Sequence, residues 1–190
     1  MSDAGEPTHL LERVRAEVAE HPTADVREAW SRRRILALLA WLPKPLDQHA
    51  DPIHVTGSAI VHDGAGRVLL HRHKRLGRWL QPGGHLHADE HPSDAARREA
   101  DEETGVPLQR DPRRPGLLHV DVHEGPRGHV HLDLRYLLTA PVGAVPAPAA
   151  GESSAVAWFT VVDAASLADP SLRAALTAAE RITSGRDGPR

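Results

Sequence analysis

A segment rich in carboxylates constrains this chain more than any other feature of its sequence. The Ala-rich residues from Pro92 onward predict a helix, with proline suited to its first turn and Gly105 to the position just past its end. Within this helix Glu99 precedes Glu102 by three residues and Glu103 by four, so the three carboxylates can share one side. Like charges at this spacing destabilise a helix by roughly 0.2–0.5 kcal/mol per pair, and the last turn disfavours anions. A helix selected only for stability would avoid this arrangement.

Three converging carboxylates suit a hard divalent cation. Mg²⁺ and Mn²⁺ prefer oxygen ligands, and bound Mg²⁺ is usually completed by water and by substrate phosphates. Arg98 lies four residues before Glu102 and can offset or orient a carboxylate. Gly84 ends a Gly83-Gly84 turn, where a backbone carbonyl can approach a metal. The alternative interpretation is an Ala-rich helix whose charges are simply solvated.

The same segment resembles the Nudix box. That pattern is Gly, five residues, Glu, seven residues, Arg-Glu-aliphatic, one residue, Glu-Glu, one residue, Gly-aliphatic. The positions that match are Gly84, Glu90, Arg98, Glu99, Glu102, Glu103, Gly105 and Val106. The preceding residues 79–84 also resemble the family's lead-in, and the resemblance extends over residues 53–183. Ala100 is smaller than the usual aliphatic residue, which questions the packing of the helix but not the chemistry.

The resemblance implies a fold and a reaction. The expected fold is of the α/β (α+β) class, a Nudix-type α/β/α sandwich with a mixed β-sheet. The expected reaction is Mg²⁺-dependent (or Mn²⁺-dependent) hydrolysis of a nucleoside diphosphate linked to another moiety. The contrasting class is a non-catalytic ligand-binding or regulatory Nudix-like protein, and a metal requirement for turnover would separate the two. Isopentenyl diphosphate isomerases share the fold but rely on a Cys, and this chain has none.

The resemblance also assigns roles to residues of the box. The metal-binding groups it implies are Glu99, Glu102, Glu103 and the Gly84 carbonyl. Glu90 resembles the accessory acid that pairs with Arg98 or holds a further ion. The carboxylate that takes the proton of water stays open. The candidates are Glu102 and Glu103 within the box, and Glu152 and Glu124 outside it.

Two further groups of residues are candidates for substrate binding. A basic cluster precedes the box and could contact phosphates, although a solvated loop is an equal alternative; it contains Arg72, Lys74, Arg75 and Arg78. His129, His131 and Asp133 alternate along a predicted strand, so they point to one face and could read substrate or form a second metal site. The alternative is a solvated sheet face in a His-rich chain, and His85, His119 and His123 carry less weight.

The remaining pattern divides the chain into an N-terminal helical extension (1–46), a Nudix domain (53–183) and a flexible tail (184–190). The extension is predicted to be a helical hairpin that covers the sheet, forms a dimer contact or acts as a lid. Thr23 is the expected N-cap of its second helix, and the expected apolar residues of that helix are Val26, Trp30, Ala37, Leu38 and Trp41. Strands are expected at 54–62, 67–71, 117–123, 129–139 and 155–162, and a last helix at 171–182.

Composition limits the partners. The formal net charge of −3 argues against stable nucleic-acid binding or binding to an anionic membrane, and the apolar run 35–42 is too short to span a bilayer. The absence of Cys excludes disulfides and thiolate metal sites. The N-terminus lacks the features of a signal peptide, so we expect a cytoplasmic protein with a small nucleotide-type substrate and a possible homodimer.

Overall fold

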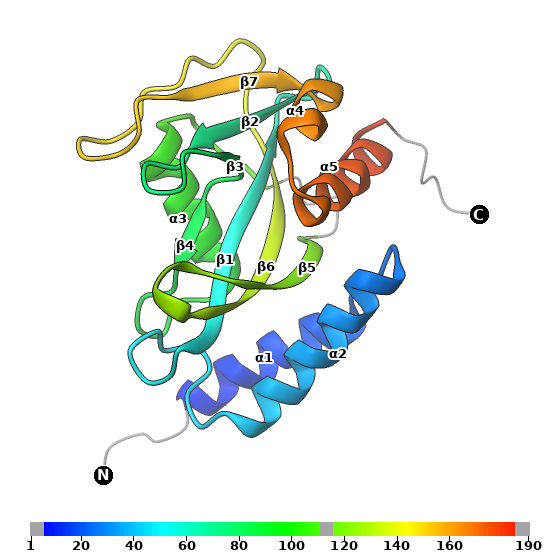
Figure 1. Cartoon of the computed structure of the whole chain (residues 1–190), viewed down its shortest axis with the longest axis vertical. Helices are drawn as coiled ribbons and strands as arrows, with labels where there is room; N and C mark the ends of the chain where they lie inside the picture. Colours follow the sequence, from blue (N-terminus) through cyan, green and yellow to red (C-terminus); the bar gives the residue numbers. More distant parts are fainter. Residues whose placement is uncertain (1–5, 111–115, 185–190) are drawn as a thin grey trace.

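A mixed β-sheet runs through the molecule between two helical layers (Figure 1). The structure is a computed structural model that describes residues 6–110 and 116–184. The helices are α1 (Glu6–Glu20), α2 (Val26–Trp41), α3 (Pro92–Thr104), α4 (Val161–Leu167) and α5 (Pro170–Thr183). The strands are β1 (Ile53–His62), β2 (Arg67–Arg72), β3 (Trp79–Leu80), β4 (Gly83–His85), β5 (Leu117–Glu124), β6 (Val130–Thr139) and β7 (Val156–Thr160). The predicted tail lies outside the described residues beyond Ser184.

The strand order confirms the mixed sheet. The path is β3-β2-β1-β6-β5, with β4 also paired to β1 and β7 to β2. β1 and β6 run parallel along their whole length, whereas the other pairings are antiparallel. On its other edge β1 pairs with β4 at residues 56–58 and with β2 at residues 61–62. Strands far apart in sequence therefore become neighbours around β1.

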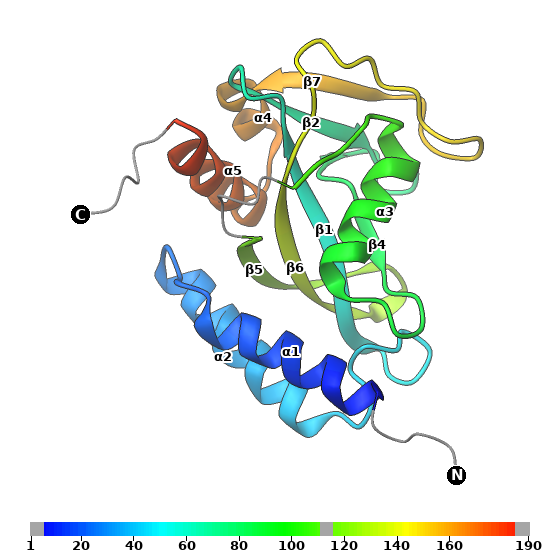
Figure 2. The same ribbon diagram turned by 180° about the vertical axis from the view of Figure 1, so that it is seen from behind.

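The two faces of the sheet are covered by different helices (Figure 2). Apolar residues such as Val55, Leu132 and Leu134 pack in one core with side chains of α1, α2 and α3. Ile60 and Leu137 point to the other face and pack against α4 and α5. Of the three roles considered for the N-terminal hairpin, covering the sheet is therefore the one that its packing supports. Among the described residues, no helix has a long enough apolar stretch to cross a membrane.

Helix α3 approaches the sheet closely because small residues line their contact. A Cβ atom at Gly57 of β1 would overlap the carbonyl oxygen of Pro92 and would lie 3.0 Å from the backbone nitrogen of Ala96. Ala100 is fully buried in the same layer. The departure from the aliphatic pattern at position 100 therefore fits this chain, because a larger side chain would push the helix away from β1.

The second helix of the hairpin differs from its prediction. Its N-cap is Asp25, whose side chain accepts a hydrogen bond from the Glu28 backbone nitrogen, and not Thr23. The predicted apolar face is confirmed only at Leu38, which is buried; Trp41 is 76% exposed, and Val26, Trp30 and Ala37 are exposed too. The helix is rotated so that Leu38 shares its buried side with Glu28, Ser31, Ile35 and Leu39.

The last predicted strand is shorter than expected because a helix begins inside it. β7 ends at Thr160, whose side chain accepts a hydrogen bond from the Asp163 backbone nitrogen and so caps α4. Val161 and Val162 therefore belong to α4, a helix that was not predicted. A polar cap can override the strand preference of two β-branched residues, because it satisfies a backbone donor of the first helical turn.

A buried carboxylate joins the hairpin to the sheet. Glu28 accepts hydrogen bonds from the backbone nitrogens of Ala24 (2.6 Å) and Val120 of β5 (3.2 Å), and its Oε1 lies 2.8 Å from His21 Nε2. Burial alone would raise the pKa of Glu28, but the hydrogen bonds with His21 and Ala24 lower it below its ordinary value. The hairpin is thus attached by polar contacts as well as by apolar packing.

We expect Glu28→Ala to destabilise the protein by about 2–4 kcal/mol, because it leaves buried donors without an acceptor. Urea unfolding of the full chain measures this change. The matched control is Glu12→Ala on α1, whose side chain is 61% exposed in its ion pair with Arg15 and should change stability by no more than about 0.5 kcal/mol. Equal unfolding midpoints for the two variants would show that Glu28 does not hold the hairpin in place.

Candidate active site

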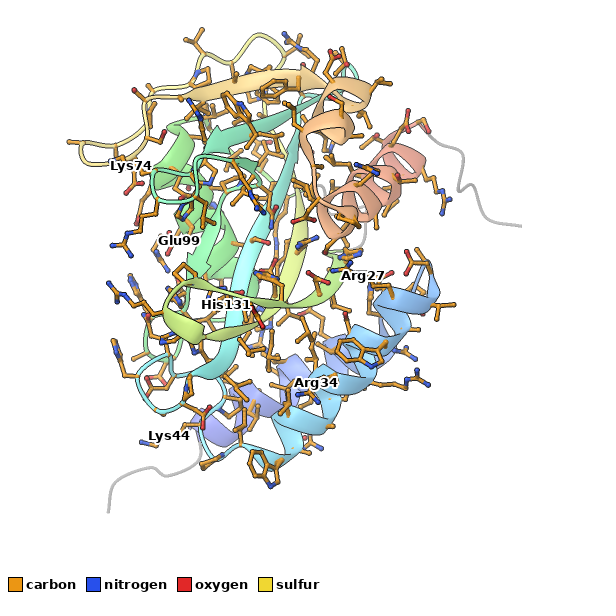
Figure 3. All side chains as sticks on the ribbon, viewed as in Figure 1. Arg27, Arg34, Lys44, Lys74, Glu99 and His131 are labelled. Atoms are coloured by element: carbon orange, nitrogen blue, oxygen red, sulfur yellow. The ribbon has the colours of Figure 1, made fainter. Side chains whose placement is uncertain are left out.

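A cavity of about 480 Å³ lies over the polar part of the sheet. Its walls come from β1, β4, β5 and β6, from the segment before β4, and from α3 through Glu99. Gln48 is the described residue nearest the N-terminus that lines it, so the hairpin does not close this cavity. In the view of Figure 3, Lys74, Glu99 and His131 follow one another along the same side of the molecule.

Strand β4 receives two of the predicted metal ligands. Gly83 and Gly84, predicted as a turn, pair with Ser58 and Gly57 of β1 and so belong to this strand. A Cβ atom at Gly84 would lie 2.5 Å from Cδ of Glu99, so only glycine lets this carboxylate pack here. Glu103 Oε2 accepts a hydrogen bond from the Gly83 backbone nitrogen (2.9 Å), and its Oε1 lies 3.4 Å from His71 Nδ1. The structure therefore brings together the two glycines and the carboxylates that the sequence singled out.

Arg98 holds this arrangement together. Its guanidinium donates to both carboxylate oxygens of Glu90 (3.0 and 2.9 Å), to Glu99 (2.8 Å) and to the His85 carbonyl oxygen (2.9 Å). Burial would raise the pKa of Glu90, but the hydrogen bonds from Arg98 lower it below its ordinary value. For Glu99 burial outweighs the same partner, and its pKa is raised. Arg98 thus stabilises the ionised form of Glu90, whereas at Glu99 it offsets only part of the cost of burying a charge.

Negative charge accumulates at the end of α3. Burial raises the pKa of Glu103 to about 8; the Gly83 hydrogen bond opposes this shift, and the charges of Glu99, Glu152 and Glu102 add to it. The Glu102 side chain is about half exposed, and Glu152 lies in the exposed loop before β7. A group of oxygen donors that repel one another in a half-buried position fits a divalent cation, which would remove that repulsion.

The floor of the cavity is a buried polar network. Asp133 of β6 accepts hydrogen bonds from Thr56 (3.0 Å), Ser58 (3.0 Å) and Arg135 (2.9 Å), and Arg135 also donates to Ser171 at the start of α5 (2.9 Å). Burial would raise the pKa of Asp133, but the Arg135 charge lowers it, so the carboxylate stays ionised. Asp133 shares a face with His131 as predicted, but it is buried and occupied by this network instead of facing solvent.

The predicted histidines meet two others. The β1–β6 register places His54 beside His131, with ring centroids 5.4 Å apart, and His85 of β4 lies 5.1 Å from His54. His129, which immediately precedes β6, lies 5.1 Å from His54. His54 was not singled out from the sequence. The alternation of His54, Thr56 and Ser58 in an otherwise apolar strand was the signal that could have identified it.

The basic cluster is split by the structure. Arg75 and Arg78 line the cavity, whereas Arg72 donates to the Gly77 carbonyl oxygen (3.2 Å) and does not line it. Lys74 donates to the Gly151 carbonyl oxygen and thereby connects this segment to the loop that carries Glu152. The other candidate base, Glu124, lines the cavity at the end of β5.

Comparisons with known proteins agree with this geometry. Residues 52–179 match the family model of the NUDIX domain. A MutT-like protein from Streptomyces ambofaciens is 33% identical over 124 residues, which are 65% of this chain and 75% of that protein. A solved NUDIX-family hydrolase from Clostridium perfringens has a TM-score of 0.57 at 25% identity, covering 70% of this chain and 98% of its own.

A second solved structure supports the fold alone. It is an Ap4A hydrolase binary complex from C. elegans, with a TM-score of 0.60 at 18% identity over 69% of this chain and 98% of that protein. The family model extends from the start of β1 into α5 and so includes the sheet, α3 and the lining of the cavity apart from Gln48. The chain therefore belongs to the Nudix family of hydrolases.

Proposed function

We propose that the protein uses Mg²⁺ (or Mn²⁺) to hydrolyse the diphosphate linkage of a nucleoside diphosphate derivative. The observation that carries this proposal is the convergence of Glu99 and Glu103 on Gly83 and Gly84 of β4 beside a polar cavity. A non-catalytic binding protein would have no need to bury two carboxylates whose pKa values are both raised by that burial. Retention of turnover after complete metal removal would argue against the metal-dependent part of the proposal.

The groups that would hold the cation are Glu99, Glu102, Glu103 and the Gly84 carbonyl oxygen. The bound cation would polarise a phosphoryl oxygen and lower the pKa of a water molecule. Arg98 acts as a positioning residue, because its hydrogen bonds to Glu90 fix the guanidinium that orients Glu99. Glu103 must lose its proton to bind the cation, and the Gly83 hydrogen bond favours that ionised form.

Glu152 is the general base that the electrostatics favour. Its charge acts on both Glu99 and Glu103, so it is within electrostatic reach of the carboxylates that would hold the cation, although its side chain does not line the cavity. Glu102 and Glu103 are less suited to this role, since a carboxylate that binds the cation has fewer free oxygens to take a proton. Glu124 lies among the histidines at the other end of the cavity, next to Gly125.

The substrate is a small phosphorylated molecule. The cavity volume is within the usual range for small-ligand sites, and Arg75 and Arg78 place two guanidinium groups at its wall. Guanidinium groups bind phosphate oxygens through paired hydrogen bonds. Arg72 supports the loop that carries Arg78 through its bond to Gly77, so its contribution to substrate binding is indirect.

The first prediction concerns the bond that is cleaved. In ¹⁸O-labelled water with Mg²⁺, the label should appear on a product phosphate, because water attacks phosphorus. Mass spectrometry of the products from a panel of nucleoside diphosphate derivatives measures this incorporation. The control reaction contains EDTA and should release no labelled phosphate. Label found only in the sugar or acyl fragment would overturn the assignment to diphosphate cleavage.

The second prediction concerns Glu103. In EDTA, Glu103→Gln should be as stable as wild type or more stable by a few tenths to about 1 kcal/mol, because one anion leaves a crowded helix end. The pKa of Glu103 is raised from 4.5 to about 8, so the folded state favours the neutral acid. The free energy of unfolding of wild type therefore falls as pH rises from about 4.5 to 8. The stability advantage of the variant over wild type should be largest near pH 8.

Thermal melts at several pH values measure this difference, and saturating Mg²⁺ should narrow or reverse it because only wild type binds the ion fully. Activity should fall by orders of magnitude in the same variant. Asp101→Asn is the control: it removes one charge from the same helix at a residue that pairs with Arg97. A Glu103→Gln variant that is markedly less stable in EDTA would mean that Glu103 serves the fold.

The third prediction separates the candidate bases. Glu152→Gln should lower kcat by about 10²–10⁴-fold, because proton transfer from water loses its acceptor. It should still show the rise in melting temperature on addition of Mg²⁺, since the metal ligands remain. Glu124→Gln is the matched control and should keep kcat within a few-fold. The opposite result, with a large loss only in Glu124→Gln, would move the base to the other end of the cavity.

A further inference from the structure

Four histidines form a compact group beside the cavity, and three of them, His85, His129 and His131, line it. This histidine cluster consists of His54, His85, His129 and His131. Each ring offers one nitrogen, and these nitrogens all lie within 4.8 Å of one another. We propose that the histidine cluster binds a Zn²⁺ ion, at a site separate from the carboxylates of α3.

The spacing is close to that of a tetrahedral zinc site. With Zn–N distances of about 2.0–2.1 Å, tetrahedral nitrogens stand about 3.3–3.4 Å apart. The rings of the cluster need only small rotations to reach this spacing from the present limit of 4.8 Å. The backbone that carries them is fixed, because His54 and His131 are paired residues of parallel strands and His85 lies on β4, which is itself bonded to β1.

Unpartnered nitrogens point to a missing ligand. Among the described residues, the Nε2 atoms of His54, His85 and His131 are buried and have no hydrogen-bond partner. A buried polar atom without a partner costs free energy, so three such atoms in one cluster need an explanation. A single metal ion would satisfy all three at once, with the half-buried His129 as the fourth ligand.

The hydrogen bond behind His54 sets its ring for metal binding. His54 Nδ1 lies 2.9 Å from the Asp51 carbonyl oxygen. A carbonyl oxygen only accepts, so Nδ1 carries the proton and Nε2 keeps its lone pair. Histidines that bind metals commonly donate their second ring N–H to a backbone carbonyl in this way, which fixes both the tautomer and the direction of the ring.

The donor set selects the kind of metal. Neutral imidazole nitrogens suit Zn²⁺ and its neighbours in the first transition row, whereas Mg²⁺ prefers oxygen. No carboxylate belongs to the histidine cluster among the described residues. The cavity would therefore hold two different cations, a hard one at the carboxylates of α3 and Zn²⁺ at the histidines. His85 directly follows Gly84, so the zinc would also tie β4 to β1 and β6 beside the carboxylate site.

The test measures metal binding rather than turnover, so its result is independent of the proposed hydrolysis. The full chain is stripped with a chelator, which is then removed, and Zn²⁺ binding is followed by calorimetry. Co²⁺ serves as a spectroscopic probe and should give the visible absorption of a tetrahedral nitrogen site. Wild type should bind one equivalent of Zn²⁺ that excess Mg²⁺ does not displace. His54→Ala and the half-exposed His129→Ala should each weaken Zn²⁺ binding at least tenfold.

Two matched variants control for unspecific binding. His9→Ala removes an exposed histidine from α1 and should leave the zinc affinity unchanged. Glu102→Gln removes a carboxylate of α3 and should also leave the zinc affinity unchanged. The proposal would be overturned if zinc binding were lost in Glu102→Gln but kept in His54→Ala and His129→Ala. It would also be overturned if wild type bound no zinc at micromolar Zn²⁺. Histidine NMR signals that respond to inorganic phosphate and not to Zn²⁺ would assign the cluster to anion binding instead.

Discussion

The close approach of α3 to the sheet is the constraint on which the site depends. Gly57 leaves room for the backbone of α3 at Pro92, and Gly84 leaves room for the carboxylate of Glu99. A side chain at Gly57 would push the helix outward, and one at Gly84 would displace the carboxylate of Glu99 from β4. Ala100 is fully buried, and its small side chain also allows the close approach of helix and sheet. The chemistry of the cavity is therefore determined first by small residues that carry no chemistry.

This packing has an electrostatic cost, because it buries carboxylates of α3 close to one another. Burial raises the pKa of Glu103 and of Glu99, and the charges of Glu102 and Glu152 raise both pKa values further. Arg98 offsets part of the charge, but it is divided between Glu90 and Glu99 and also holds the His85 carbonyl oxygen. A cation or a proton would relieve the remaining repulsion, and this electrostatic cost supports the proposed divalent metal site.

Sequence reasoning succeeded where the determining contacts are local. The bounds of α3 follow from Pro92 and Gly105, which act within one turn of the helix ends, and the structure has the same bounds. The mixed sheet followed from a family pattern whose spacing is fixed along the chain. The sequence did not reveal the orientation of α2. The polar Glu28 faces inward to reach β5, and its partner there, the backbone nitrogen of Val120, is distant in sequence. Nor did the sequence place His54 beside His131, since register between parallel strands is set by tertiary packing.

The two ends of the cavity differ in the chemistry of their donors, and β4 connects them. Gly84 receives the oxygen donors of α3, and the next residue, His85, joins the nitrogen donors of β1 and β6. Arg98 reaches from one group to the other, because it bonds both the Glu99 carboxylate and the His85 carbonyl oxygen. A shift of this three-residue strand would therefore alter both groups together. Since β4 is paired to β1 along all three of its residues, it holds both groups in place, and a ligand bound at either end would reinforce the geometry of the other.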